Sequence, residues 1–156
     1  METESDQVEY VGFWLRVWAT LIDAVLLLLI CWPLLIWIYG WEYFDSEALV
    51  VGPADFIISW LLPDIAIVIL WIKYQATPGK FAIKARVLDA RTQKPASVVR
   101  YIIRLLGCYI SALPIGLGFI WVAFDKRKQG WHDKMANTVV VRYPLSRQNT
   151  SVDVDT

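Results

Sequence analysis

The sequence predicts an all-α integral membrane protein with two full transmembrane helices and a third apolar segment, either one broken helix or a re-entrant hairpin. Three observations support this prediction. Of the 156 residues, 57% are hydrophobic and nine are tryptophan, far more than a soluble domain usually carries. Two apolar runs are long enough to cross a bilayer, which needs about 20 helical residues. A third run is interrupted by proline and glycine.

The first predicted membrane helix covers residues 12–39 and contains one carboxylate, Asp23. A charged side chain inside a span is costly and is by default a functional candidate. Arg16 lies seven residues earlier, on the same helical face. The rise between the two residues is about 10.5 Å, which is too long for direct contact. Arg16 therefore either finds a partner on another helix or subunit, or snorkels to the headgroups.

The second predicted helix covers residues 56–74, and Pro63 and Asp64 are expected to break its middle. Counted from the predicted cytoplasmic ends of their helices, Asp23 and Asp64 both lie roughly 13–15 Å deep. The two carboxylates can thus meet near mid-bilayer, where both cannot ionise cheaply. Such a pair suits exchange of a proton for a hard cation. Alternatively, each carboxyl group is neutral or hydrogen-bonded and serves helix packing.

Residues 101–124 form the third apolar run, with Pro114, Gly116 and Gly118 inside it. It is either one tilted, broken span or two half-helices that turn back, which a bilayer tolerates when protein covers the break.

Two segments that flank the third run are typical of strands. Residues 80–90 (KFAIKARVLDA) alternate between apolar and polar, and TVVVRY at 138–143 is rich in β-branched residues. They predict a small cytoplasmic β pair if both lie on one side of the membrane. TPGK at 77–80 predicts a turn, because the glycine spacing of a phosphate loop is missing.

The distribution of charge predicts the topology. Residues 73–104 hold eight Lys or Arg and one acid, so this loop and the N-terminus are expected in the cytoplasm and the acidic loop 42–55 outside. The basic run 126–128 also favours the cytoplasm, which a hairpin explains and a single third crossing does not. The acidic start, METESDQVEY, differs from the basic start of a signal peptide.

One membrane domain is expected over residues 10–145, between a polar lead (1–9) and a disordered tail (146–156). Cys31 and Cys108 lie in apolar runs and are expected to be buried thiols, so neither a disulfide nor a metal site is predicted. The one histidine lies far from the serines, which argues against an enzyme or a cofactor. The basic loop is expected to contact membrane lipids rather than nucleic acid.

Other charged residues are candidate partners of the intramembrane acids. Arg104 lies one turn inside the third apolar run, where it either neutralises Asp23 or Asp64 or anchors to lipid headgroups. Asp133 follows His132 in a polar cluster after this run. It either gates a cytoplasmic entry, or caps a helix or forms a salt bridge to the loop.

Three blocks follow one another along the chain: GFWLRVWATLIDAVLLL, TPGKFAIKARVLDARTQKPASVVRYIIR and LPIGLGFIWVAFDKRKQGWHDKMANTVVVR. Together they resemble the RDD family of small bacterial membrane proteins, which is named for one arginine and two aspartates. The resemblance covers residues 10–143. It implies that the family's arginine corresponds to Arg16, its first aspartate to Asp23 and its second to Asp133.

The resemblance implies a bacterial cytoplasmic membrane location and a transport role, with exchange of Na⁺ or another monovalent cation for protons proposed for some members. Asp23 and Asp64 would then bind the ion or proton, helped by Arg16, Arg104 and Asp133. Two or three helices rarely enclose a pathway, since monomeric transporters are built from larger repeats. A homo-oligomer or a complex with another membrane protein is therefore expected. The alternative function is a membrane assembly or interaction module without transport.

Overall fold

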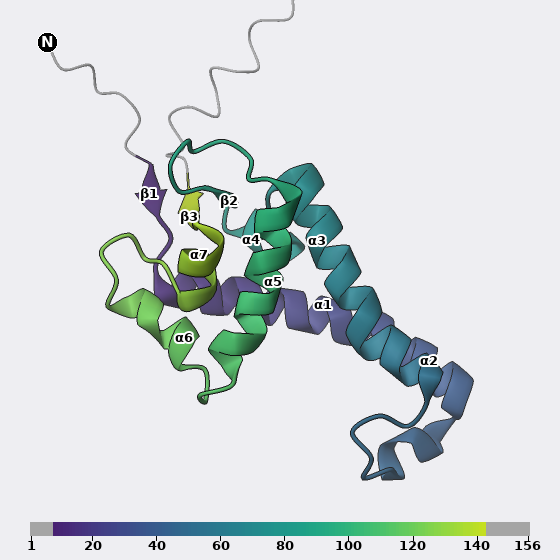
Figure 1. Ribbon diagram of the computed structural model, residues 1–156. Coiled ribbons are helices and arrows are strands. Elements are labelled where there is room, and N and C mark those ends of the chain that lie inside the picture. Colours follow the sequence, from purple (N-terminus) through teal and green to yellow (C-terminus); the bar gives the residue numbers. More distant parts are fainter. Residues whose placement is uncertain (1–7, 143–156) are drawn as a thin grey trace, which may run out of the picture.

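The computed structural model describes residues 8–142, and two long helical runs dominate it (Figure 1). The first is α1 (Phe13–Tyr39). The second runs without interruption from α2 (Pro53–Phe56) through the π-helix η2 (Ile57–Leu61) to α3 (Leu62–Tyr74). Both runs are long and apolar enough to cross a membrane, as the sequence predicts. The short 3-10 helix η1 (Trp41–Asp45) lies in the connection between them.

Helix α1 has an apolar interior and ends at a glycine. Gly40 has a φ of 73°, a conformation that glycine adopts without steric penalty, and its N–H bonds the carbonyl of Ile36. Pro33 lies inside the helix without ending it. Neighbouring groups in a membrane protein can compensate for the hydrogen bond that a proline removes.

The irregularity in the second helix begins earlier than predicted. Pro63 and Asp64 do not break it but lie in the first turn of α3, while the π-helical turn precedes them at 57–61. Proline cannot donate a backbone hydrogen bond, so the turn before it is where the regular pattern is lost. The thiol of Cys31 on α1 donates to the carbonyl of Ile58 in this π-helical turn, at 3.5 Å.

Three strands form one antiparallel sheet in the order β1–β3–β2: β1 (Glu9–Tyr10), β2 (Ala85–Asp89) and β3 (Thr138–Arg142). The predicted pairing of the two later strands is confirmed, with Val87 opposite Val140. The third strand, β1, was not predicted, and it includes Glu9, the last residue of the expected polar lead, which pairs with Arg142. The rest of that lead and the predicted tail lie outside the described residues.

A short helix replaces the turn predicted at 77–80. Helix α4 (Pro78–Ala82) begins after Thr77, and the strand predicted from residue 80 begins only at Ala85. Proline suits the first turn of a helix because its missing N–H would have no partner there.

The third apolar run is a sharply bent pair of helices. Helix α5 (Val98–Ala112) is followed by α6 (Leu117–Ile120) and the 3-10 helix η3 (Trp121–Ala123), and the break bends by 111°. Helix α7 (Trp131–Ala136) packs back against α5. The contact is close: a Cβ added to Gly107 on α5 would lie 2.8 Å from the Cα of His132.

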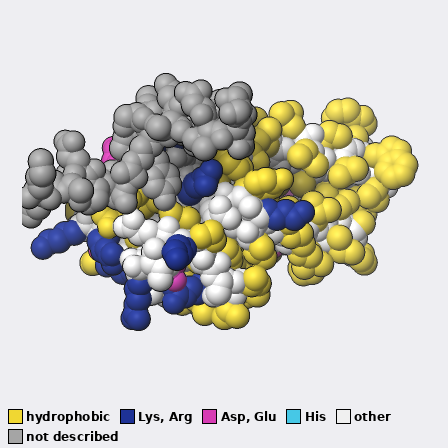
Figure 2. Space-filling model, turned by 90° about the horizontal axis from the view of Figure 1, so that it is seen from above, with side chains coloured by type: hydrophobic (Ala, Val, Ile, Leu, Met, Phe, Trp, Pro, Cys, Tyr) yellow, Lys and Arg dark blue, Asp and Glu magenta, His cyan; other side chains and the backbone are white. Residues whose placement is uncertain are grey.

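The main hydrophobic core lies where the sheet meets the ends of the helices. Its buried members come from four elements and the one residue Val11 between β1 and α1: Val11, Trp71, Ala85, Val87, Tyr101 and Val140. Away from this core, large apolar side chains are exposed along both long helices. Figure 2 shows hydrophobic side chains covering the end of the molecule with α2, while Lys and Arg gather toward the sheet end.

Candidate functional site

Asp133 is fully buried and joins two arginines from different helices. Its exposed fraction is 0%. One carboxylate oxygen accepts a hydrogen bond from Nη1 of Arg16 on α1 at 2.5 Å, and the other accepts one from Nη1 of Arg104 on α5. The backbone N–H of Gly130, which precedes α7, also donates to this carboxylate at 3.1 Å. A single side chain therefore links α1, α5 and α7.

The two arginines find further acceptors, which matters because one carboxylate cannot neutralise both. Arg16 donates to the carbonyl of Val11 at 3.1 Å and to the carbonyl of Lys128. Arg104 donates to the hydroxyl of Thr138 at 2.9 Å, and its guanidinium lies 5.2 Å from the ring centroid of Trp71. Carbonyl, hydroxyl and ring contacts of this kind lower the cost of burying the second positive charge.

His132 completes what we call the Asp133 cluster: Asp133, Arg16, Arg104 and His132. Its Nε2 lies 3.5 Å from Asp133, and its Nδ1 lies 3.5 Å from the hydroxyl of Ser111. Burial lowers the pKa of His132 to about 2, and the nearby Arg104, Arg16 and Lys80 act in the same direction. The imidazole is therefore neutral at physiological pH and adds no third positive charge.

Asp23 holds the start of α4 against α1. Its carboxylate accepts a hydrogen bond from the hydroxyl of Thr77 at 2.5 Å and one from the backbone N–H of Gly79 at 2.7 Å. Gly79 leaves no room for a side chain, because an added Cβ would overlap the carbonyl of Ala19. The sequence carried a signal for this helix start that the turn prediction missed: a threonine at the cap followed by proline.

Lys80 lies one residue beyond this contact and carries a perturbed charge. Burial lowers the pKa of its ammonium group to about 8, and Arg104 and Arg16 add to the effect, while Asp23 opposes it. Its Nζ donates to the hydroxyl of Thr77 at 3.5 Å. The segment 77–80 thus brings a cation close to both the Asp23 contact and the Asp133 cluster.

Asp64 takes a different partner from Asp23. The hydroxyl of Tyr109 on α5 donates to its carboxylate at 2.6 Å. The prediction that Arg104 neutralises Asp23 or Asp64 is wrong. Arg104 forms its ion pair with Asp133 instead. The prediction that Arg16 has a partner on another helix is confirmed. Asp133 caps α7 as one alternative expected, but its ion pairs are with arginines on α1 and α5 rather than with the loop.

Sequence reasoning missed the buried role of Asp55, which it placed in an exposed acidic loop. The residue is 2% exposed. Its carboxylate accepts hydrogen bonds from the hydroxyls of Tyr43 and Ser59, at 2.8 and 2.7 Å, and from the N–H of Val51 at 2.8 Å. The four-residue spacing from Asp55 to Ser59 is a detectable helical signal. This carboxylate fastens the connection between the two long helices to the start of the second.

The buried acids described above form hydrogen bonds and ion pairs within the chain. Across residues 8–142, no group of three or more His, Cys, Asp or Glu side chains is placed to hold a metal ion. Cys31 and Cys108 are free thiols. The carboxylates of Asp23, Asp55 and Asp133 each accept hydrogen bonds from the backbone of the same chain.

The fold is that of a small, mostly helical protein with two helices long and apolar enough to cross a membrane. The chain belongs to the RDD family, whose model matches residues 10–137, as the three sequence blocks indicated. It is similar to "Uncharacterized membrane protein YteJ" of Bacillus subtilis (strain 168), with 28% identity over 157 residues that cover 89% of this chain and 85% of the relative. No solved structure matches the chain.

Proposed function

We propose that this protein is a non-transporting assembly module of the bacterial cytoplasmic membrane, in which buried charges hold a cytoplasmic sheet on a pair of transmembrane helices. One observation supports this best: the carboxylates of Asp133 and Asp23 both accept hydrogen bonds from distant parts of their own chain. An exchanging carboxylate must trade such donors for an ion in every cycle. Doing so at Asp23 would release α4 from α1.

The orientation follows from charge. Exposed Lys and Arg residues lie toward the sheet end: Lys73, Arg86, Arg91, Lys94, Lys126 and Arg127. The positive-inside rule favours the cytoplasm for this end, and therefore for the N-terminal strand β1. The connection fastened by Asp55 then faces outward.

The partner we propose is a second copy of the chain, in contact through one face of α1. Exposed apolar residues recur on this helix at spacings of three and four: Trp14, Trp18, Leu21, Val25, Leu29 and Trp32. This spacing lines up along one side of a helix and suits packing against another helix. A dimer contact there would leave the Asp133 cluster undisturbed inside each copy.

Cysteine cross-linking in membranes tests this function. The background carries Cys31→Ala and Cys108→Ala, and single cysteines replace Val25 on the α1 face or, as a matched control, Ile65 on α3, which is also about half exposed. We expect disulfide-linked dimers from Val25→Cys and none from Ile65→Cys. The proposed assembly module would be refuted if the protein in lipid nanodiscs had the mass of one chain and cysteines at Val25, Leu21 and Leu29 gave no cross-link.

Cation/proton exchange is the second candidate, and one observation favours it. Asp64 lies well inside the second long helix, one turn after a π-helical segment, and such segments are frequent at functional sites. Its bond is to the hydroxyl of Tyr109, which is 44% exposed, rather than to a buried cation. This carboxylate is therefore more available than Asp23 to a proton or a monovalent cation.

Everted vesicles with an acid interior test exchange. Na⁺, Li⁺ or K⁺ is added and decay of the proton gradient is followed for wild type and Asp64→Asn at equal membrane levels. Asp23→Asn serves as a comparison. Cation-dependent decay that is lost in Asp64→Asn, with the dimer intact, would favour exchange over the module. No response from assembled wild type would eliminate it.

A further inference from the structure

We propose that the bent pair α5 and α6–η3, together with its turn at 113–116, is a lipid-inserted hairpin. It enters the acyl chains of the leaflet on the sheet side and returns to the same side without crossing. This interaction surface, and lipid as its occupant, go beyond the proposed function and do not depend on it. Geometry, exposed apolar area and flanking charge each support it.

The sheet fixes where the hairpin begins and ends. Strand β2 precedes α5 and β3 follows α7, and the two strands are hydrogen-bonded neighbours. The chain between them therefore crosses a membrane either not at all or an even number of times. Two crossings are impossible by length. Helix α5 is about 22 Å long and the return arm, residues 117–123, about 10 Å, whereas the hydrocarbon core is about 30 Å thick.

The hairpin stays at one end of the molecule. In Figure 1, α6 lies on the same half as α7 and the strands, far from the α2 end that the two long helices reach. A hairpin that crossed beside α3 would carry its turn toward α2. The observed placement fits insertion into one leaflet, whose hydrocarbon depth is about 15 Å.

Helix α5 is polar inside and apolar outside. Its buried residues are Tyr101, Arg104, Gly107 and Ser111. Exposed apolar residues run along the opposite face and into the turn: Val99, Ile102, Leu106, Ile110, Leu113 and Ile115. This inverted pattern is typical of a helix that meets protein on one side and hydrocarbon on the other.

The turn presents its most apolar side chain outward at a backbone cost. Ile115 is 95% exposed and has a φ of 55°, a left-handed conformation that a β-branched residue rarely adopts. Leu113 beside it is 82% exposed. In water this arrangement combines strain with exposed apolar area. In acyl chains the exposed area becomes favourable, which accounts for a turn built in this way.

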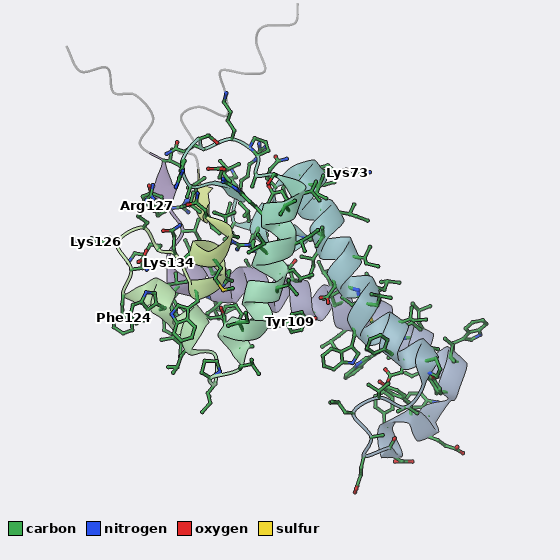
Figure 3. All side chains as sticks on the ribbon, viewed as in Figure 1. Lys73, Tyr109, Phe124, Lys126, Arg127 and Lys134 are labelled. Carbon is green, nitrogen blue, oxygen red and sulfur yellow. The ribbon has the colours of Figure 1, made fainter. Side chains whose placement is uncertain are left out.

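After the return arm, an aromatic residue comes first and basic residues follow. This order suits a chain that leaves the acyl chains and passes the headgroups. Phe124 is 79% exposed, and the exposed cations Lys126 and Arg127 follow it. Figure 3 shows Phe124 on the side of the loop near α6, with Lys126 and Arg127 nearer the sheet. Aromatic side chains at the interface with cations above them suit anionic headgroups.

Depth-dependent quenching tests the hairpin. In the Cys31→Ala, Cys108→Ala background, Ile115→Cys carries an environment-sensitive fluorophore in vesicles of phosphatidylcholine and phosphatidylglycerol. Lipids with a doxyl group near the headgroup or at mid-chain are the quenchers. We expect loss of fluorescence with the mid-chain quencher, and protection of the unlabelled thiol from impermeant maleimide on both sides.

Two exposed positions calibrate sidedness: Leu49→Cys, in the connection between the long helices, and Lys94→Cys, between β2 and α5. Each should react from one side only, and the two from opposite sides. If Ile115→Cys fails to accumulate, Phe124→Cys replaces it and should be quenched more strongly by the shallow lipid.

Three results would overturn the inference. Labelling of Ile115→Cys from the Leu49 side would mean that the segment crosses. Labelling from the Lys94 side without quenching would place the turn in water. A disulfide between two copies at Ile115 without quenching would make the turn a protein contact.

Discussion

Arg16 and Asp133 are 117 residues apart in the chain, yet Nη1 of the arginine lies 2.5 Å from Oδ2 of the aspartate. The pair ties the start of α1 to α7. Because Arg104 on α5 binds the other carboxylate oxygen, three helices depend on one side chain. The stability of the chain should therefore respond sharply to loss of that carboxylate.

Asp133→Asn removes the negative charge and leaves two buried arginines facing each other. Breaking a buried ion pair on one side typically costs about 3–5 kcal/mol, so we expect a loss of that order in unfolding free energy in detergent micelles. The matched control is Glu9→Gln, which breaks the exposed pair with Arg142 and should cost less than about 1 kcal/mol. Equal, small losses in both variants would contradict the central role of Asp133.

Asp23 and Thr77 should be energetically coupled. Asp23→Ala and Thr77→Val each remove the hydrogen bond between them, so the double variant should lose less than the sum of the single losses. Coupling energies between residues in contact are about 0.5–3 kcal/mol. A double-mutant cycle of unfolding free energies measures the coupling. Strict additivity would mean that the bond between Asp23 and Thr77 does not help to hold α4 in place.

Gly79→Ala should destabilise the contact between α4 and α1. The new methyl group would overlap the backbone of Ala19, which cannot rotate away as a side chain could. Overpacking of this kind costs about 1–3 kcal/mol. Gly12→Ala is the control, because no atom lies within 4 Å of its added Cβ; only a smaller capping cost is expected. Thermal unfolding followed by circular dichroism compares them, and an unaffected Gly79→Ala would refute the close approach.

Buried His132 should make the fold sensitive to mild acid. Its folded-state pKa of about 2 lies below the ordinary value of 6.5, so above that value the imidazole is neutral in both states. As pH falls below 6.5, only the unfolded chain takes up the proton, and stability is lost by up to about 1.4 kcal/mol per pH unit.

Unfolding free energies between pH 6.5 and 5 measure this slope before most carboxylates titrate. His132→Gln should flatten the slope relative to wild type. Identical slopes would mean that the imidazole is protonated in the folded state.

The two long helices could be predicted from sequence because each is a continuous apolar run, and membrane burial depends on composition more than on tertiary contacts. The start of α1 was predicted within one residue. The π-helical turn was not predicted, because the sequence places Pro63 but does not say how the preceding turn rearranges.

The candidate site was predictable in its members and less so in its pairings. The cost of burying a charge identifies Arg16 and Asp23 inside an apolar run. Asp133 lies in a polar segment, and only the family resemblance singled it out. Which acid meets which base depends on where the six-residue helix α7 folds back, and that depends on the close approach at Gly107. A short helix placed by tertiary packing has little sequence signal of its own.

The strand order β1–β3–β2 also determines when the sheet can form during synthesis of the chain. The central strand β3 is the last of the three to be synthesised, so β1 and β2 have no shared neighbour until residue 142 has left the ribosome. Asp133 leaves the ribosome only shortly before residue 142. Arg16 and Arg104 therefore have no counter-ion while the earlier helices are being inserted. A nascent chain stopped before this point would present two unmatched charges and open strand edges, which are the features that chaperones and quality-control proteases recognise.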